Sequence, residues 1–178
     1  MARVRYTKNE LKNKKQALER YERYLPTLQL KKHQLMVRVQ QVQDQLEEKM
    51  AERQQLENQL ENWVHLFAES IDFNQYIRVE EIRSSNKNIV GVFIPVLEEI
   101  KFNQKLPDLF ATPAWIDSGI EAIKETIRLR VQIDFLQRQY KLLWQELRTT
   151  NQRVNLFEKI KIPECKENIR MIQVFLGD

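Results

Sequence analysis

The stretch YLPTLQLKKHQL, Tyr24 to Leu35, decides the fold, because it places a proline in the middle of an otherwise helical pattern. The apolar repeat keeps one phase across the proline, through Leu18, Tyr21, Leu25, Leu28 and Leu35. Two separately packed helices would have no reason to share one register, so the stretch predicts a single helix. The ring of Pro26 removes the donor that would bond the carbonyl of Glu22, which predicts a bend there.

The repeat extends far on both sides of this stretch. Thr7-Lys8-Asn9-Glu10 has the pattern of a capping box, which predicts the start of the helix. We define the first seam as the positions that follow at alternating steps of three and four: Leu11, Lys14, Leu18, Tyr21, Leu25, Leu28, Lys32, Leu35, Val39, Val42, Leu46, Lys49, Arg53, Leu56, Leu60, Trp63 and Phe67. Thirteen of these seventeen are apolar, and a repeat of 3.5 predicts a coiled coil. We expect one helix to about Ser70, roughly 95 Å long.

A second helical pattern occupies the C-terminal third. The second seam is Leu129, Ile133, Leu136, Tyr140, Leu143, Leu147, Thr150, Val154 and Phe157, and only Thr150 is polar. An upstream stripe in a slightly different phase contains Ile116, Ile120, Ile123 and Ile127. Thr112-Pro113 predicts a helix start, as N-cap and first helical residue. Pro163 predicts a second bend or break, after which Ile169, Ile172 and Leu176 resume the pattern.

The middle of the chain has a different pattern. Residues 76–83 predict a strand, and residues 89–94 predict a second, apolar strand that Pro95 helps to end. The turn is predicted between them, at Ser84, Ser85, Asn86, Lys87 and Asn88. Residues 96–102 suit a short helix or an extended segment. These patterns predict a small β-hairpin module.

Together the patterns predict a mainly α fold: a long antiparallel two-helix coiled coil with a small β-hairpin and short-helix module in the middle. The N-terminal arm is expected at 1–70, the central module at 71–113 and the C-terminal arm at 114–178, within one elongated domain. The matched lengths of the arms favour an intramolecular hairpin over a swapped dimer.

Composition excludes several classes of protein. Three glycines, five prolines and 30% charged residues favour long helices. No run approaches the ~20 apolar residues of a membrane span, and the basic N-terminus lacks the apolar core of a secretory signal, so the simplest location is the cytoplasm. Residues 1–38 carry eleven Lys and Arg against three Asp and Glu, whereas residues 39–110 carry seven against thirteen. The basic end suits an acidic protein surface or nucleic acid, or is simply a solvated helix face.

The sequence offers no catalytic, cofactor-binding or metal site. His33 and His65 are far apart, and Cys165, the only cysteine, has no base near it in sequence. Three glycines cannot build a phosphate-binding loop. Nucleic-acid binding through Lys31-Lys32 and the basic start is disfavoured by the scarcity of aromatic residues there.

Four seam positions of the first helix carry cations instead of apolar side chains: Lys14, Lys32, Lys49 and Arg53. Their stems can cover apolar surface while their charged ends reach water. The alternative is that the helix pair is incompletely covered there and that a third protein packs against it. The role of the apolar run 89–94 is also left open: it is either an interaction edge or a contact with the chain's own helix.

Three segments resemble the D subunits of the V-type (V/A-type) ATPases. They are TKNELKNKKQALERYERYLPTLQLKKHQL near the start, NIVGVFIP at 88–95, and TTNQRVNLFEKIKIP at 149–163. The last is similar to the family signature T-x-x-R-V-N-x-x-E followed by Ile-Pro, with matches at Thr150, Arg153, Val154, Asn155, Glu158, Ile162 and Pro163. Leu156-Phe157 departs from the usual alanine-leucine pair, and Pro26 from the small residue common in the first helix. Family members usually continue with a basic helical stretch after the position of Gly177-Asp178.

The resemblance implies that the chain is the central-stalk rotor shaft of a rotary ATPase, which is a non-catalytic subunit without cofactors. It implies that the terminal helices enter a hexamer of A and B subunits, with Lys31, Lys32, Arg153, Asn155 and Glu158 as contacts and bends at Pro26 and Pro163. The middle of the chain would meet the F subunit and the C-type (d-type) socket above the membrane ring, with residues 84–88 as a contact or regulatory hairpin. The location would be cytoplasmic and peripheral to the membrane. The alternative is a generic coiled-coil tether without ATPase association.

Overall fold

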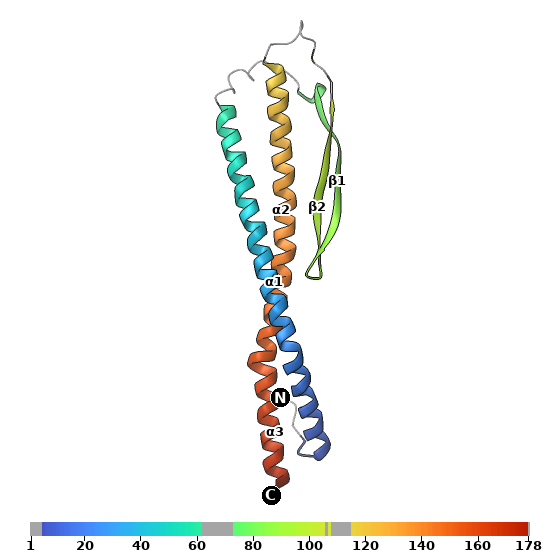
Figure 1. Ribbon diagram of the computed structural model, residues 1–178, viewed down its shortest axis with the longest axis vertical. Helices are drawn as coiled ribbons and strands as arrows, with labels where there is room; N and C mark the ends of the chain where they lie inside the picture. The colour runs from blue at the N-terminus through green and yellow to red at the C-terminus, as the bar shows by residue number, and fades with distance from the viewer. Residues whose placement is uncertain (1–4, 62–72, 106, 108–114, 178) are drawn as a thin grey trace. The chain divides into compact units, whose positions relative to one another are not determined.

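A computed structural model describes residues 5–61, 73–105, 107 and 115–177. The described part is mainly helical with one two-stranded antiparallel sheet (Figure 1). Its contacts divide the chain into two compact units. The terminal unit contains residues 1–38 and 144–178, and the central unit contains residues 39–143. No helix in the described ranges is long and apolar enough to cross a membrane.

Helix α1 (Lys8–Glu61) is uninterrupted, so the prediction of a single helix through Pro26 is confirmed. Of the predicted capping box, the N-cap bond is present, because the amide of Glu10 donates to Oγ1 of Thr7 at 3.2 Å. The reciprocal bond is not made, since the amide of Thr7 donates to the carbonyl of Arg5. Pro26 lies on the exposed side of the helix. The bend at Pro26 stays a prediction, and the expected end near Ser70 lies outside the described residues.

The first seam is the buried side of α1. All fifteen of its described positions are buried or half-buried, and Leu35, Val39 and Val42 are the most buried of them. Trp63 and Phe67 lie outside the described residues. The steps of three and four in the sequence therefore identified the packed face of this helix.

The C-terminal third is one continuous helical path in three segments: α2 (Ile116–Leu156), a π-helical turn η2 (Phe157–Lys161) and α3 (Ile162–Gly177). Every position of the second seam is buried or half-buried, including Thr150. The N-cap predicted at Thr112 lies outside the described residues.

Pro163 does not break this helical path, so the alternative of a break is wrong. The π turn ends at Lys161, two residues before the proline, and the amide of Ile162 donates to the carbonyl of Phe157, five residues back. A proline in an α-helix removes one bond and its ring clashes with a carbonyl four residues back. A π turn changes which carbonyls are bonded, and such turns often mark the site of a kink. The bend itself stays a prediction.

Within the terminal unit, α1 packs antiparallel against the C-terminal helices. Tyr6 stacks on Phe175 with ring centroids 5.1 Å apart, and Tyr21 lies at the same distance from Phe157. Further along α1, Nζ of Lys31 is 2.6 Å from Oε1 of Glu146. Residue numbers rise on one side of these pairs as they fall on the other, which requires opposite helix directions.

In the central unit, a hairpin of β1 (Ile77–Ile89) and β2 (Val92–Gln104) turns at Val90-Gly91. The predicted turn at Ser84, Ser85, Asn86, Lys87 and Asn88 is therefore wrong, because these residues belong to β1. Both turn residues have positive φ, 52° at Val90 and 82° at Gly91, as a two-residue hairpin turn of type I′ requires. Asn88 supports the turn through Oδ1, which accepts from the amide of Gly91 at 2.9 Å.

Pro95 lies inside β2, opposite Asn86, and does not end a strand as predicted. Its carbonyl accepts from Nε2 of Gln139 on α2 at 2.6 Å. The N–H and C=O of one strand residue point to the same side, so the missing donor of Pro95 faces α2 and not β1. No bond of the ladder is lost, and the strand continues through residues 96–102.

The base of the hairpin packs against the start of α2. Ile77, Ile116 and Ile120 form a buried cluster, and the half-buried side chains around it are Phe73, Tyr76, Phe102 and Ile123. The guanidinium of Arg128 lies 5.6 Å from the ring centroid of Phe102. Since Pro95 meets Gln139 further along α2, β2 runs beside this helix (Figure 1). Residues 78–88 of β1 are exposed throughout.

Candidate partner-binding surfaces

The described residues hold no constellation for metal or nucleophilic chemistry. No group of three or more potential metal ligands occurs among them. His33 is exposed on α1, and His65 lies outside the described residues. Cys165 is buried, and this burial raises the pKa of its thiol, against the lowering effect of Lys14. A thiol with a raised pKa is mostly protonated at neutral pH and is a poor nucleophile.

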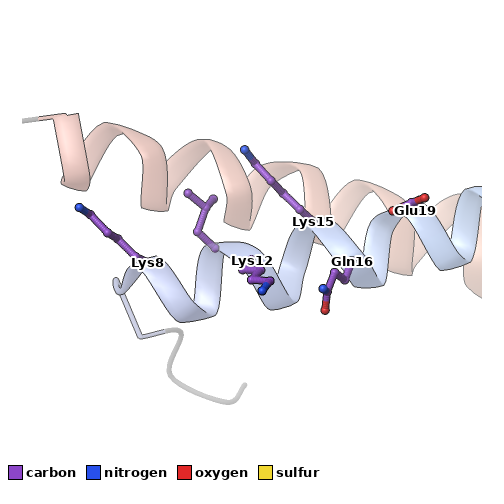
Figure 2. A pocket seen from close by; sticks show the side chains of 6 residues that line it. Lys8, Lys12, Lys15, Gln16 and Glu19 are labelled. Atoms are coloured by element: carbon purple, nitrogen blue, oxygen red, sulfur yellow. The ribbon is translucent and has the colours of Figure 1, made fainter.

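The first surface of interest is a lysine face at the start of α1. Lys8, Lys12 and Lys15 are exposed and recur at helical spacing, next to Leu11, Gln16 and Glu19. Figure 2 shows these side chains around a shallow hollow of about 270 Å³. Glu19 is the one carboxylate in the lining, and it also lies 3.7 Å from Arg23. This face holds three of the eleven Lys and Arg of residues 1–38.

Lys31 and Lys32, which were predicted together as partner contacts, have different surroundings. Lys31 is half-buried and pairs with Glu146, so it joins α1 to α2 inside the terminal unit. Lys32 lies on the first seam and lines a hollow with Met36, Trp144 and Arg148. Both lysines are half-buried, and the sequence did not distinguish the one that pairs with Glu146 from the one that lines the hollow.

The C-terminal signature divides into buried and exposed positions. Thr150 and Val154 are buried, so they serve packing between the helices. Arg153 and Glu158 are exposed, and Asn155 is half-buried. Glu158 lies in the π turn, one turn from Asn155. Arg153 and Glu158 are thus accessible on the terminal unit, whereas Thr150 and Val154 lie in its core.

The hairpin residues predicted as a contact remain accessible although they do not form the turn. Residues 84–88 are all exposed on β1. Across the turn, Phe93 is paired with Asn88 and is 68% exposed, which is the largest exposure among the large apolar side chains that the structure describes. Sequence reasoning assigned Phe93 to an apolar strand and left open whether that strand met a partner. Ile94 of the same run is 2% exposed, so the run 89–94 has a residue packed inside the chain beside an accessible one, and both readings of the run stay predictions.

Sequence reasoning missed Trp144 and Arg148, which lie on α2 between seam positions. The guanidinium of Arg148 lies 5.8 Å from the ring centroid of Trp144, and the indole is 45% exposed. Their spacing of four residues, aromatic then cation, is a pattern that predicts such a pair on a helix.

Comparisons with known proteins agree across the chain. The family model for the D subunit of ATP synthase matches residues 10–178. A protein of Borreliella burgdorferi, named as the D subunit of a V-type ATP synthase, is 42% identical over 178 residues, which is 100% of this chain and 88% of that protein. Proteins of the same name from Chlamydia pneumoniae and Chlamydia muridarum are 34% and 33% identical; the matches span 98% and 99% of this chain and 85% and 89% of those proteins.

Proposed function

Since the chain belongs to the family of ATP synthase D subunits, we propose that it is the central-stalk rotor shaft of a V-type rotary ATPase. In this role it transmits rotation between a hexamer of A and B subunits, where ATP is hydrolysed or made, and an ion-transporting ring that moves protons or sodium. The shaft itself is non-catalytic and carries no cofactor. It lies in the cytoplasm, peripheral to the membrane as part of the complex.

The observation that carries the proposal is the uninterrupted α1 and its antiparallel packing in the terminal unit. A shaft must resist bending and twisting, and a helix pair with a continuous buried seam provides that stiffness. We propose that the seam packing is that of a two-stranded coiled coil. Pro26 and the π turn before Pro163 would make the pair asymmetric, which lets one shaft act differently on three catalytic interfaces.

We propose that the terminal unit enters the hexamer. The accessible contacts would be Lys32, Arg153 and Glu158, with Asn155 beside them and Lys31 held by Glu146. The lysine face of Figure 2 adds long-range attraction toward an acidic wall. The terminal helices also expose Val174 and Phe175, which suit an apolar sleeve around the shaft.

We assign the central unit to the contacts nearer the membrane. The exposed residues Ser84, Ser85, Asn86, Lys87 and Asn88 and the neighbouring Phe93 would meet the F subunit or regulate hydrolysis. The C-type (d-type) socket would hold the shaft above the membrane ring. The alternative function, a tether unrelated to an ATPase, accounts for the helix pair but not for the family match along the chain.

Affinity purification of the tagged chain from its own cells at moderate salt tests the proposal. We expect the A, B and F subunits to elute together with the chain, identified by mass. A matched sample in 1 M salt should show which contacts depend on the basic face, because salt screens exposed charges. If the chain elutes alone, with nucleic acid or with one unrelated protein, the shaft assignment is wrong and the tether takes its place.

A further inference from the structure

A groove in the terminal unit lies where the first and second seams meet. It has a volume of about 340 Å³ and is lined by Lys32 and Met36 of α1 and by Trp144, Leu147, Arg148 and Asn151 of α2. Lys32 and Leu147 are seam positions, so the groove opens at a point where a lysine replaces an apolar seam residue. We call it the Trp144 groove. Its size suits one or two protruding side chains.

The walls of the Trp144 groove are apolar but accessible. Met36 and Trp144 are each almost half exposed, and Leu147, a position of the second seam, is half-buried. Trp, Met and Arg are enriched at protein interfaces, and buried Trp and Arg contribute much of the binding free energy there. Arg148 lies against the Trp144 ring, which limits the freedom of both side chains before any partner binds.

The charge of the groove is positive and uncompensated. Lys32 and Arg148 are its charged residues, and within the described ranges no carboxylate lies within ion-pair distance of either one. The neighbouring Lys31 does have such a partner, Glu146 at 2.6 Å. A partner that binds in this groove is therefore complementary in charge when it brings a carboxylate.

We propose that the Trp144 groove binds an apolar side chain of another subunit, presented by a segment that also carries a carboxylate. The apolar side chain packs on Trp144, Met36 and Leu147, and the carboxylate pairs with Arg148 or Lys32. This inference rests on the proposed function, because it names the chemistry of a subunit contact on the shaft. It also explains why a lysine occupies this seam position, since the charged end of Lys32 faces a partner.

Crosslinking in the assembled complex tests the proposal directly. Met36 is replaced by p-benzoylphenylalanine in the tagged full chain, which is then assembled with the remaining ATP synthase subunits and illuminated. We expect a crosslink to one segment of another subunit that contains an apolar residue within four positions of Asp or Glu. A crosslink to a second copy of this chain, to nucleic acid or to a segment without a carboxylate overturns the proposal, as does no crosslink in a complex that assembles.

Binding measurements separate this contact from general stability. Trp144→Ala and Arg148→Glu should each weaken binding to the remaining soluble subunits at least tenfold, while Trp144→Phe and Lys32→Arg stay within threefold. Leu142→Ala and Lys141→Glu are the matched controls, since both are exposed on α2 outside the groove. Replacing the crosslinked carboxylate by lysine should restore binding to Arg148→Glu. If the controls weaken binding equally, the groove assignment is wrong and the shaft function stands; if the unaltered chain does not assemble, both fall.

Discussion

The terminal unit and the hairpin of the central unit distribute their buried side chains differently. In the terminal unit, Leu35, Val154 and Ile172 are buried at well-separated points along the helices. In the hairpin, one residue of β1, Ile77, is buried, and the next eleven are exposed. A helix pair therefore spreads its stabilisation along its whole length. The hairpin depends on its base, on β2 and on a two-residue turn.

This difference suits the two roles proposed. An element that transmits torque needs contacts along its full length, so that no single section twists independently. An element that binds or regulates needs accessible backbone and side chains, and it is drawn from the less stable parts of a structure. Four sets of substitutions can show whether stabilisation is spread along the terminal unit and concentrated at a few points of the hairpin.

The largest effect is expected in the seam. Leu35→Ala removes a side chain with 0% exposure and should lower the free energy of unfolding by about 2–5 kcal/mol. Leu30→Ala is the matched control, because Leu30 is 57% exposed on the same helix and should change stability by less than about 0.5 kcal/mol. Urea unfolding followed by far-UV circular dichroism measures both. Equal losses in the two variants would show that the first seam is not the packed face.

The base of the hairpin should come next. Ile77→Ala is expected to cost about 2–3 kcal/mol, because the exposed hairpin can partly close over the lost volume. Amide hydrogen exchange should rise throughout both strands, since Ile77 connects them to Ile116 and Ile120. Ile82→Ala on the same strand is the control, with Ile82 being 44% exposed. Unchanged exchange in the Ile77 variant would mean that the hairpin is held elsewhere, for example by Gln139.

Substitutions in the turn should change the stability of the hairpin by a smaller amount, and the two variants should change it in opposite directions. Gly91→Ala places a Cβ at φ 82° and should destabilise the hairpin by about 1–2 kcal/mol. Val90→Asn should stabilise it by up to about 1 kcal/mol, since Asn tolerates the φ of 52° that a β-branched residue strains to adopt. Exchange rates of the strand amides report both changes. If Val90→Asn speeds exchange, the turn does not adopt this conformation in solution.

The same contrast explains what the sequence was able to predict. The first seam repeats over fifteen described positions, so single exceptions such as Lys14 or the nearby Pro26 do not obscure it. The hairpin turn depends on two residues, and the polar run 84–88 imitates a turn more strongly than Val90-Gly91 does. Pro95 was wrongly predicted to end a strand because its missing donor faces α2, and the sequence does not show that tertiary contact. The π turn at 157–161 has no comparable signal in the sequence.

The candidate surfaces were predictable only in part, for a related reason. The signature predicted Arg153 and Glu158 as contacts, and both are exposed. Whether they bind the A and B subunits stays a prediction. The Trp144 groove went unnoticed because the seam pattern marks buried positions, whereas the groove depends on the residues that flank them. The paired lysines, by contrast, were seen as one basic feature, and only the contact with Glu146 separates them.

The smallest effect is expected at the ion pair of Lys31 and Glu146. Each side chain is 30% exposed, so solvent screens the 2.6 Å contact, and its coupling free energy should be no more than about 1 kcal/mol. A double-mutant cycle with Lys31→Met and Glu146→Gln measures that coupling by urea unfolding, and 0.5 M salt should reduce it. Because the pair joins α1 to α2 at one point among many, its loss should leave the helix pair folded. A coupling well above 2 kcal/mol would show that stabilisation in the terminal unit is concentrated here, and the contrast with the hairpin would disappear.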